Sequence, residues 1–292
     1  FIGINLLGIK ESATFSLVVT LLAVGELLVY IGIVAPHFSY ETFVTDPMPF
    51  GWQGVFAALP FAIWFYLAIE AEEVENPKKT ISLGYIYGIL TLVVLALAVM
   101  IFTGGVTHWK LLSDIDYPLP AVLGHLLGRE SNLTHLFASL GLFGLIASFH
   151  GTIIGYSRQI FALARSGYLP SFLGRVNQTP HWALIIGGLI GCVALSLGTT
   201  DQVIILAALG AVVMYMISMV ALLVLRTKEP QLERPFTVPF YPVFPILALI
   251  LSAICLIAIV YYNFILSLWF FGGFIILAVI FIATGKHKNL NH

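Results

Sequence analysis

The chain has 292 residues, of which 60% are hydrophobic and 9% charged, and its formal net charge is −1 at pH 7. Soluble domains carry about 25% charged residues, so this composition excludes a soluble globular protein and predicts that lipid surrounds much of the surface. The small net charge argues against a nucleic-acid partner. Cys192 and Cys255 both lie in apolar runs, which argues against a disulfide framework or a zinc site.

Eight segments are long and apolar enough to cross a hydrocarbon core, which takes about 20 helical residues. They predict an all-α, polytopic membrane protein with a single membrane domain over 1–292. Only Asn263 separates the last two segments, which should therefore form a tight helical hairpin. The expected spans are 13–34, 52–72, 80–106, 133–163, 182–199, 202–225, 243–262 and 264–284.

The basic residues predict the orientation of these spans. If Phe1 is cytoplasmic, the outside loops hold only Lys110 and Arg129, which is a strong positive-inside bias. Both ends of the chain should then face the cytoplasm of a cell whose inner or plasma membrane holds the protein. The remaining basic residues fall inside: Lys10, Lys78, Lys79, Arg158, Arg165, Arg175, Arg226, Lys228, Arg234, Lys286 and Lys288.

The first span carries a carboxylate, Glu26, near its middle. A carboxylate at that depth is costly and normally faces a cavity or a partner. Two interpretations stay open. Glu26 either binds and releases a proton or contacts a cation, or it forms a hydrogen bond to a neighbouring helix that serves packing alone.

The second span has Pro60 at its centre. Proline frees a backbone acceptor that lipid cannot satisfy, and broken helices in transporters often line the substrate site. We expect helix from Trp52 to about Pro60, an irregular stretch, and helix again from Leu67. The irregular stretch would offer carbonyls and aromatic faces to an ammonium group; its residues are Phe61, Ala62, Ile63, Trp64, Phe65 and Tyr66. The alternative is a proline-kinked structural helix.

A group of carboxylates ends this span. We expect Glu70 to have a structural or gating role rather than direct substrate contact. The others are expected to be solvated on the cytoplasmic side or paired with lysines; these residues are Glu72, Glu73, Glu75, Lys78 and Lys79.

The longest outside loop, 107–132, contains a predicted amphipathic helix over 118–128, with proline near its start and glycine at its end. This helix either forms part of an outer gate or lies at the membrane interface without gating. No pair of histidines has metal-ligand spacing, so neither a metal nor a cofactor is expected.

His150 lies in the middle of the fourth span. It is either a hydrogen-bonded core residue or a residue that lines the pore or handles protons. Small residues around it permit close approach of a neighbouring helix; these are Gly141, Gly144, Gly151 and Gly155.

Three motifs resemble those of the amino acid–polyamine–organocation (APC) permeases. The run Glu72–Ile81 resembles the signature E-E-x-x-N-P-x-x-x-I that follows the family's sixth span. Residues 157–170 resemble the S-R…A-R-x-G-x-L-P signature that follows its eighth. Asn5, Gly8 and Lys10 resemble the N-x-x-G-x-K start of its fifth, and the run Pro60–Glu70 looks most like the ethanolamine permease branch.

The resemblance implies a leucine-transporter-like inverted-repeat fold with one discontinuous helix in this chain. Residues 52–225 would form the second five-helix repeat, 1–35 the last helix of an otherwise missing first repeat, and 243–284 a C-terminal hairpin. We therefore expect an N-terminally truncated fragment of a longer protein. One departure is that only Ala71 separates Glu70 from Glu72, where family members carry several more residues, which would shift the inner half of the broken helix.

The implied function is secondary active transport of an amino acid or a small amine, ethanolamine favoured, by proton coupling or exchange. Candidate partners are this substrate, a proton and the lipid bilayer. Two other classes stay open. An ion channel would need a pore ring or filter repeat, and a membrane-embedded enzyme would need clustered His, Asp or Cys; neither pattern stands out in the sequence.

Overall fold

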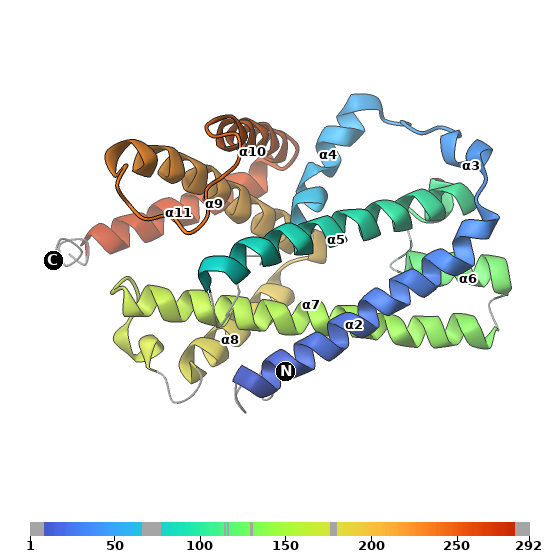
Figure 1. Ribbon diagram of the computed structural model, residues 1–292, viewed down its shortest axis with the longest axis horizontal. Coiled ribbons are helices and arrows are strands. Elements are labelled where there is room, and N and C mark those ends of the chain that lie inside the picture. Colours follow the sequence, from blue (N-terminus) through green and yellow to red (C-terminus); the bar gives the residue numbers. More distant parts are fainter. Residues whose placement is uncertain are drawn as a thin grey trace. The chain divides into compact units, whose positions relative to one another are not determined.

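The computed structural model describes residues 9–65, 77–113, 115, 117–128, 131–175 and 180–283, and every regular element in these ranges is a helix (Figure 1). The chain divides into two compact units. The first comprises the described residues up to Pro49 together with Gly84–Gly155. The second comprises those of Phe50–Leu83, Tyr156–Val176 and Pro180–His292.

Within these ranges, six helices are long and apolar enough to cross a membrane, which confirms six of the eight predicted spans. They are α2 (Ile9–Val34), α5 (Pro77–Val106), α7 (Asn132–Arg165), α9 (Thr200–Lys228), α10 (Val243–Tyr262) and α11 (Phe264–Ala283).

The two other predicted spans are covered by shorter helices. The helix α4 (Gly51–Trp64) covers the first part of 52–72, and α8 (His181–Leu197) covers 182–199 with 17 residues. These two spans stay predictions. The remaining elements are η1 (Ala35–His37), α3 (Tyr40–Val44), η2 (Trp109–Leu111), α6 (Pro118–Leu127) and η3 (Ser171–Gly174).

Local chemistry explains several helix ends. The amphipathic helix expected over 118–128 is α6, which ends before Gly128, whose φ of +93° favours glycine. The helix α9 begins with a capping box, because the Thr199 hydroxyl accepts from the Gln202 N–H and the Gln202 side chain accepts from the Thr199 N–H. The expected hairpin of α10 and α11 is also present, with Asn263 alone between the two helices.

In the first unit, α2 and α7 pack antiparallel. Phe15 contacts His150 near one end of the contact, and Tyr30 contacts Phe137 near the other. Between them, Ala23 faces Gly144 and Glu26 faces Gly141. The buried core of this unit lies beside Tyr30 and takes residues from α2, α6 and α7: Tyr30, Val34, Val122, Leu123 and Phe137.

A buried hydrogen bond ties α2 to α5 in the same unit. The Tyr30 hydroxyl lies 2.7 Å from the Thr103 Oγ1, and Tyr30 is fully buried. Because lipid offers neither hydroxyl an alternative partner, this bond positions the two helices against each other.

In the second unit, α4, α9 and α10 pack against one another, and α9 also contacts α8 and α11. The buried core of this unit consists of Ile205, Ala208, Leu209, Val212 and Ile259, against which Ile63 of α4 packs. On the other side of this unit, the Tyr156 hydroxyl donates to the Leu184 carbonyl at 2.9 Å, and the Tyr156 ring lies over Gly187 of α8.

The Tyr30–Thr103 bond is expected to appear as a coupling energy. Tyr30→Phe and Thr103→Val should each lower the free energy of unfolding, and the double variant should lose less than the sum by about 0.6 kcal/mol, the mean for interhelical hydrogen bonds in membranes. Unfolding in detergent micelles measures this double-mutant cycle. Strictly additive losses would show that the bond is not formed.

The position of the Tyr156 ring predicts a difference between two glycines of α8. A Cβ at Gly187 would overlap the ring, whereas a Cβ at Gly191 would meet nothing within 4 Å. Gly187→Ala should therefore cost about 1–3 kcal/mol of stability, while Gly191→Ala should be neutral or slightly stabilising. Thermal unfolding of the two variants measures the difference, and equal midpoints would contradict this packing.

Candidate functional site

The helix α4 runs without interruption through Pro60 to Trp64, so the expected irregular backbone over Phe61–Trp64 is a wrong prediction. Pro60 has no N–H and cannot donate to the Phe56 carbonyl. The helix nevertheless persists, because Pro60 is buried and α4 is packed along α9 and α10. This packing outweighs the loss of one backbone bond, which costs about 3 kcal/mol.

The helical end of α4 still offers backbone acceptors. Phe61–Trp64 form its last turn, and Phe65 is the C-cap, whose N–H donates to the Ile63 carbonyl. The last carbonyls of any helix lack partners within that helix, and the helix dipole makes this end negative. Five of the six candidate substrate residues, Phe61–Phe65, therefore lie at a helix terminus rather than in an unwound stretch.

The side chains of this segment divide into two groups. Ile63 packs into the core formed by α9 and α10. Trp64 is 46% exposed and makes an edge-to-face contact with Phe65, with ring centroids 6.1 Å apart, and Phe61 and Ala62 are also exposed. Tyr66 and Glu70 lie outside the described residues.

A groove of about 350 Å³ lies beside α4 in the second unit. It is lined by Phe56 of α4 and by apolar and tyrosine side chains of α10: Ile254, Ile257, Ala258, Tyr261 and Tyr262. Phe56 lies one helical turn before Pro60, so the groove is next to the proline. No charged group lines it, and it therefore does not by itself form a site for a zwitterion or an ammonium ion.

Glu26 lies on the face of α2 that packs against α7, and only 8% of its surface is exposed. The glycine opposite creates the room for its side chain, because a Cβ at Gly141 would lie 3.3 Å from the Glu26 Oε1. Within the described part of the chain, no hydrogen bond or ion pair engages this carboxylate. The described residues therefore do not contain the hydrogen bond that the packing interpretation requires.

His150 is fully buried on the same helix contact and packs edge-to-face on Phe15, with ring centroids 5.0 Å apart. Phe15 precedes Glu26 by eleven residues, which is about 16 Å along a helix. Glu26 and His150 thus face the same α2–α7 contact but do not form one site. The described residues contain no group of three potential metal ligands.

Sequence analysis identified Glu26, but it placed Gly141 and Gly144 only in the surroundings of His150, and it missed Arg226 and Arg234 as site residues. These two residues frame a second cavity, at the end of α9. Neither lies in a periodic pattern, and a run of basic residues at a helix end usually indicates only a cytoplasmic anchor.

Comparison of the sequence with known proteins places the chain in a family. A family model described as amino acid permease matches residues 1–284. The branched-chain amino acid permease BcaP of Bacillus subtilis (strain 168) is 29% identical over 98% of this chain and 62% of its own length. The methylthioribose transporter of the same organism is 28% identical over 97% of this chain and 62% of its own length.

An uncharacterized transporter of Rhizobium meliloti (strain 1021) is 30% identical over 88% of this chain and 58% of its own length. The chain thus spans about three fifths of the length of these relatives. The family match and the six apolar helices identify a multi-pass membrane protein and agree with the resemblance to the APC permeases. The chain belongs to the amino acid permease family.

Proposed function

We propose that the chain is the larger part of a secondary transporter that carries an amino acid or a small amine across the inner or plasma membrane, with both termini of this chain cytoplasmic. The family match over residues 1–284 is the observation that supports this most directly. The expected leucine-transporter-like arrangement, with 52–225 as the second repeat, belongs to the same proposal.

The ammonium group of the substrate would bind at the end of α4. The carbonyls of its last turn and the negative end of its dipole suit a cation. The exposed rings of Trp64 and Phe65 add aromatic faces within reach of the same place. Phe61, Ala62, Ile63 and Tyr66 complete the proposed substrate segment, with the Ile63 side chain facing the core.

The identity of the substrate is a separate part of the proposal. Relatives are named for branched-chain amino acids, methylthioribose and cystine/glutamate, and all but methylthioribose carry an ammonium group beside a carboxylate. Ethanolamine carries the ammonium group alone and is favoured by the Pro60–Glu70 resemblance. Uptake of radiolabelled leucine and of radiolabelled ethanolamine into proteoliposomes shows whether the substrate is an amino acid or ethanolamine.

This uptake assay uses the protein expressed from its gene with any coding sequence that precedes Phe1. Saturable uptake that follows an imposed gradient supports a transporter. Flux that does not saturate would indicate a channel, and chemical conversion of the substrate would indicate an enzyme.

Glu26 is the proposed coupling carboxylate. It is buried in a helix that is long and apolar enough to span the membrane. The residue of α7 opposite it is Gly141, which has no side chain and so leaves space for the carboxylate. Glu70 is proposed as a gating residue, and His150 as a residue that lines the pore or handles protons.

Trp64→Ala is expected to weaken substrate binding by about threefold to thirtyfold, the effect of one cation–π contact. Trp52→Ala is the matched control, because Trp52 lies at the opposite end of α4 and is 72% exposed. Equilibrium binding of the radiolabelled substrate measures both. Equal dissociation constants for the two variants would place the Trp64 ring outside the site.

Glu26→Gln is expected to reduce proton-driven uptake to the rate measured without a gradient, while substrate exchange continues, because an amide cannot bind and release a proton. Glu41→Gln, which removes an exposed carboxylate on α3, serves as the control. An unchanged pH dependence of uptake in Glu26→Gln would remove the coupling role.

A further inference from the structure

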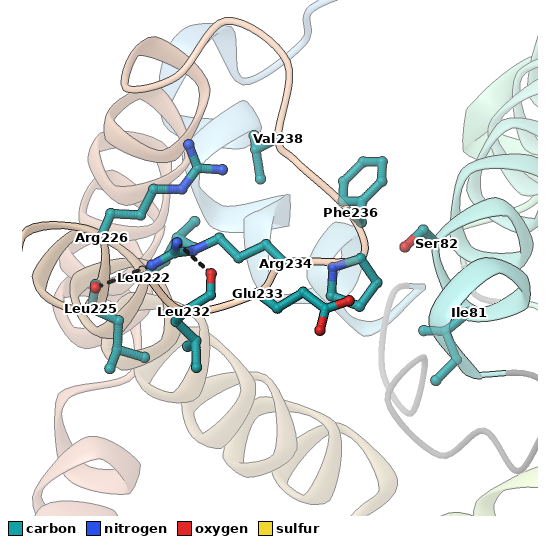
Figure 2. A pocket seen from close by; sticks show the side chains of 11 residues that line it. Ile81, Ser82, Leu222, Leu225, Arg226, Leu232, Glu233, Arg234, Phe236 and Val238 are labelled. Atoms are coloured by element: carbon teal, nitrogen blue, oxygen red, sulfur yellow. Dashed lines mark hydrogen bonds between the residues drawn. The ribbon is translucent and has the colours of Figure 1, made fainter. Parts of the chain in front are cut away.

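The segment between α9 and α10 folds back over the end of α9 and borders an open cavity of about 360 Å³ (Figure 2). The end of α9, the connecting segment and the start of α5 all contribute to its walls, and all of these residues lie in the second unit. The distribution of basic residues predicts that this end of α9 is cytoplasmic. The cavity would then lie at the inner surface of the membrane.

Arg234 holds the connecting segment in this position. Its Nη1 donates to the carbonyls of Pro230 and Leu232, and its Nη2 donates to those of Leu225 and Glu229, at distances of 2.7–3.3 Å. Two of these carbonyls belong to the last turn of α9 and its C-cap, where a positive charge is favourable. Because backbone acceptors engage these donors, Arg234 adds positive charge to the cavity and serves mainly to keep its wall in place.

Arg226 is the arginine with unused hydrogen-bonding capacity. Its Nε is buried and has no hydrogen-bond partner within the described residues. The Cζ of its guanidinium lies 4.3 Å from the centre of the Tyr241 ring, which covers one face of the group. The N–H donors lie in the plane of the guanidinium, so the ring leaves them available to an acceptor. Within the described residues no hydrogen bond engages the two Nη groups either. An acceptor that enters the cavity can therefore bind them, whereas the buried Nε is not accessible to it.

The other walls indicate what kind of molecule carries this acceptor. They are mostly apolar, with Leu222, Leu225, Phe236 and Val238 around the arginines (Figure 2). Inorganic phosphate would satisfy Arg226 but would gain nothing from these walls. An anionic phospholipid presents a phosphate to the guanidinium and acyl chains to the leucines. The carboxylate of Glu233, which projects at the opposite side of the cavity near Ile81, disfavours a second anionic group there.

We propose that this cavity binds one anionic phospholipid of the inner leaflet, with its phosphate on Arg226 and an acyl chain against Leu222 and Leu225. The site joins α9, the connecting segment and the start of α5, so an occupied site would stabilise the position of these elements relative to one another. It is independent of the proposed substrate site and would exist whatever the protein transports.

Native mass spectrometry of the detergent-purified protein tests this, with phosphatidylglycerol and phosphatidylcholine as probes. Arg226→Gln should weaken phosphatidylglycerol binding about tenfold, the value of one charged hydrogen bond. Lys228→Gln, which removes an exposed charge two residues further along α9 and outside the cavity, should leave binding unchanged. Leu222→Trp, which fills the cavity without altering charge, should also weaken it.

Several outcomes would overturn the proposal. Phosphatidylglycerol bound equally by the wild-type protein and Arg226→Gln would exclude Arg226 as its partner. Displacement of the lipid by millimolar inorganic phosphate would identify a free anion as the ligand. Equal binding of phosphatidylcholine would show that no anionic lipid is selected. Leu222→Trp keeps the test decisive if Arg226→Gln does not fold, because its retention of full binding would by itself contradict the proposal.

Discussion

The contact between α2 and α7 depends on two glycines. Gly141 and Gly144 remove side chains from α7 at the places where Glu26 and Ala23 of α2 approach it. Between transmembrane helices, association relies on close packing and on interhelical hydrogen bonds, since lipid is as apolar as the side chains themselves. The same contact that lets the helices approach thus also makes room for a carboxylate at a depth where few carboxylates are tolerated.

This arrangement explains why Glu26 is a candidate for function rather than for stability. A carboxylate kept for packing would be hydrogen-bonded, as the neighbouring Tyr30 is to Thr103. Glu26 is buried without such a bond in the described residues. The unfavourable burial supports the proposed role of Glu26 as the coupling carboxylate.

Much of the fold could be predicted from the sequence because lipid imposes a simple rule: every backbone group in the hydrocarbon must be satisfied within the chain, and helices achieve this locally. Long apolar runs such as 243–262 therefore become helices with the predicted bounds. The amphipathic helix α6 and the hairpin at Asn263 followed from proline, glycine and chain length in the same way.

The site was harder to predict, because it depends on packing between segments that lie far apart in the sequence. Pro60 suggested an irregular stretch, yet burial against α9 and α10 keeps α4 helical to Trp64. The position of Glu26 in the middle of an apolar span identified it, but only the structure shows that it faces Gly141 and that His150 contacts α2 elsewhere. The pairing of Arg226 with Tyr241 and of Arg234 with four carbonyls depends on a loop conformation that has no periodic signature.

The most direct test of this account is disulfide cross-linking between α2 and α7 in the membrane. A Cβ at Gly144 would lie 3.9 Å from that of Ala23, within the range of about 3.5–4.5 Å that disulfides require. With Cys192 and Cys255 replaced by serine, the pair Ala23→Cys and Gly144→Cys should cross-link rapidly under mild oxidation. The pair Ala23→Cys and Gly151→Cys, two turns away along α7, should not. Cross-linking of the second pair but not the first would contradict the register that places Glu26 against Gly141.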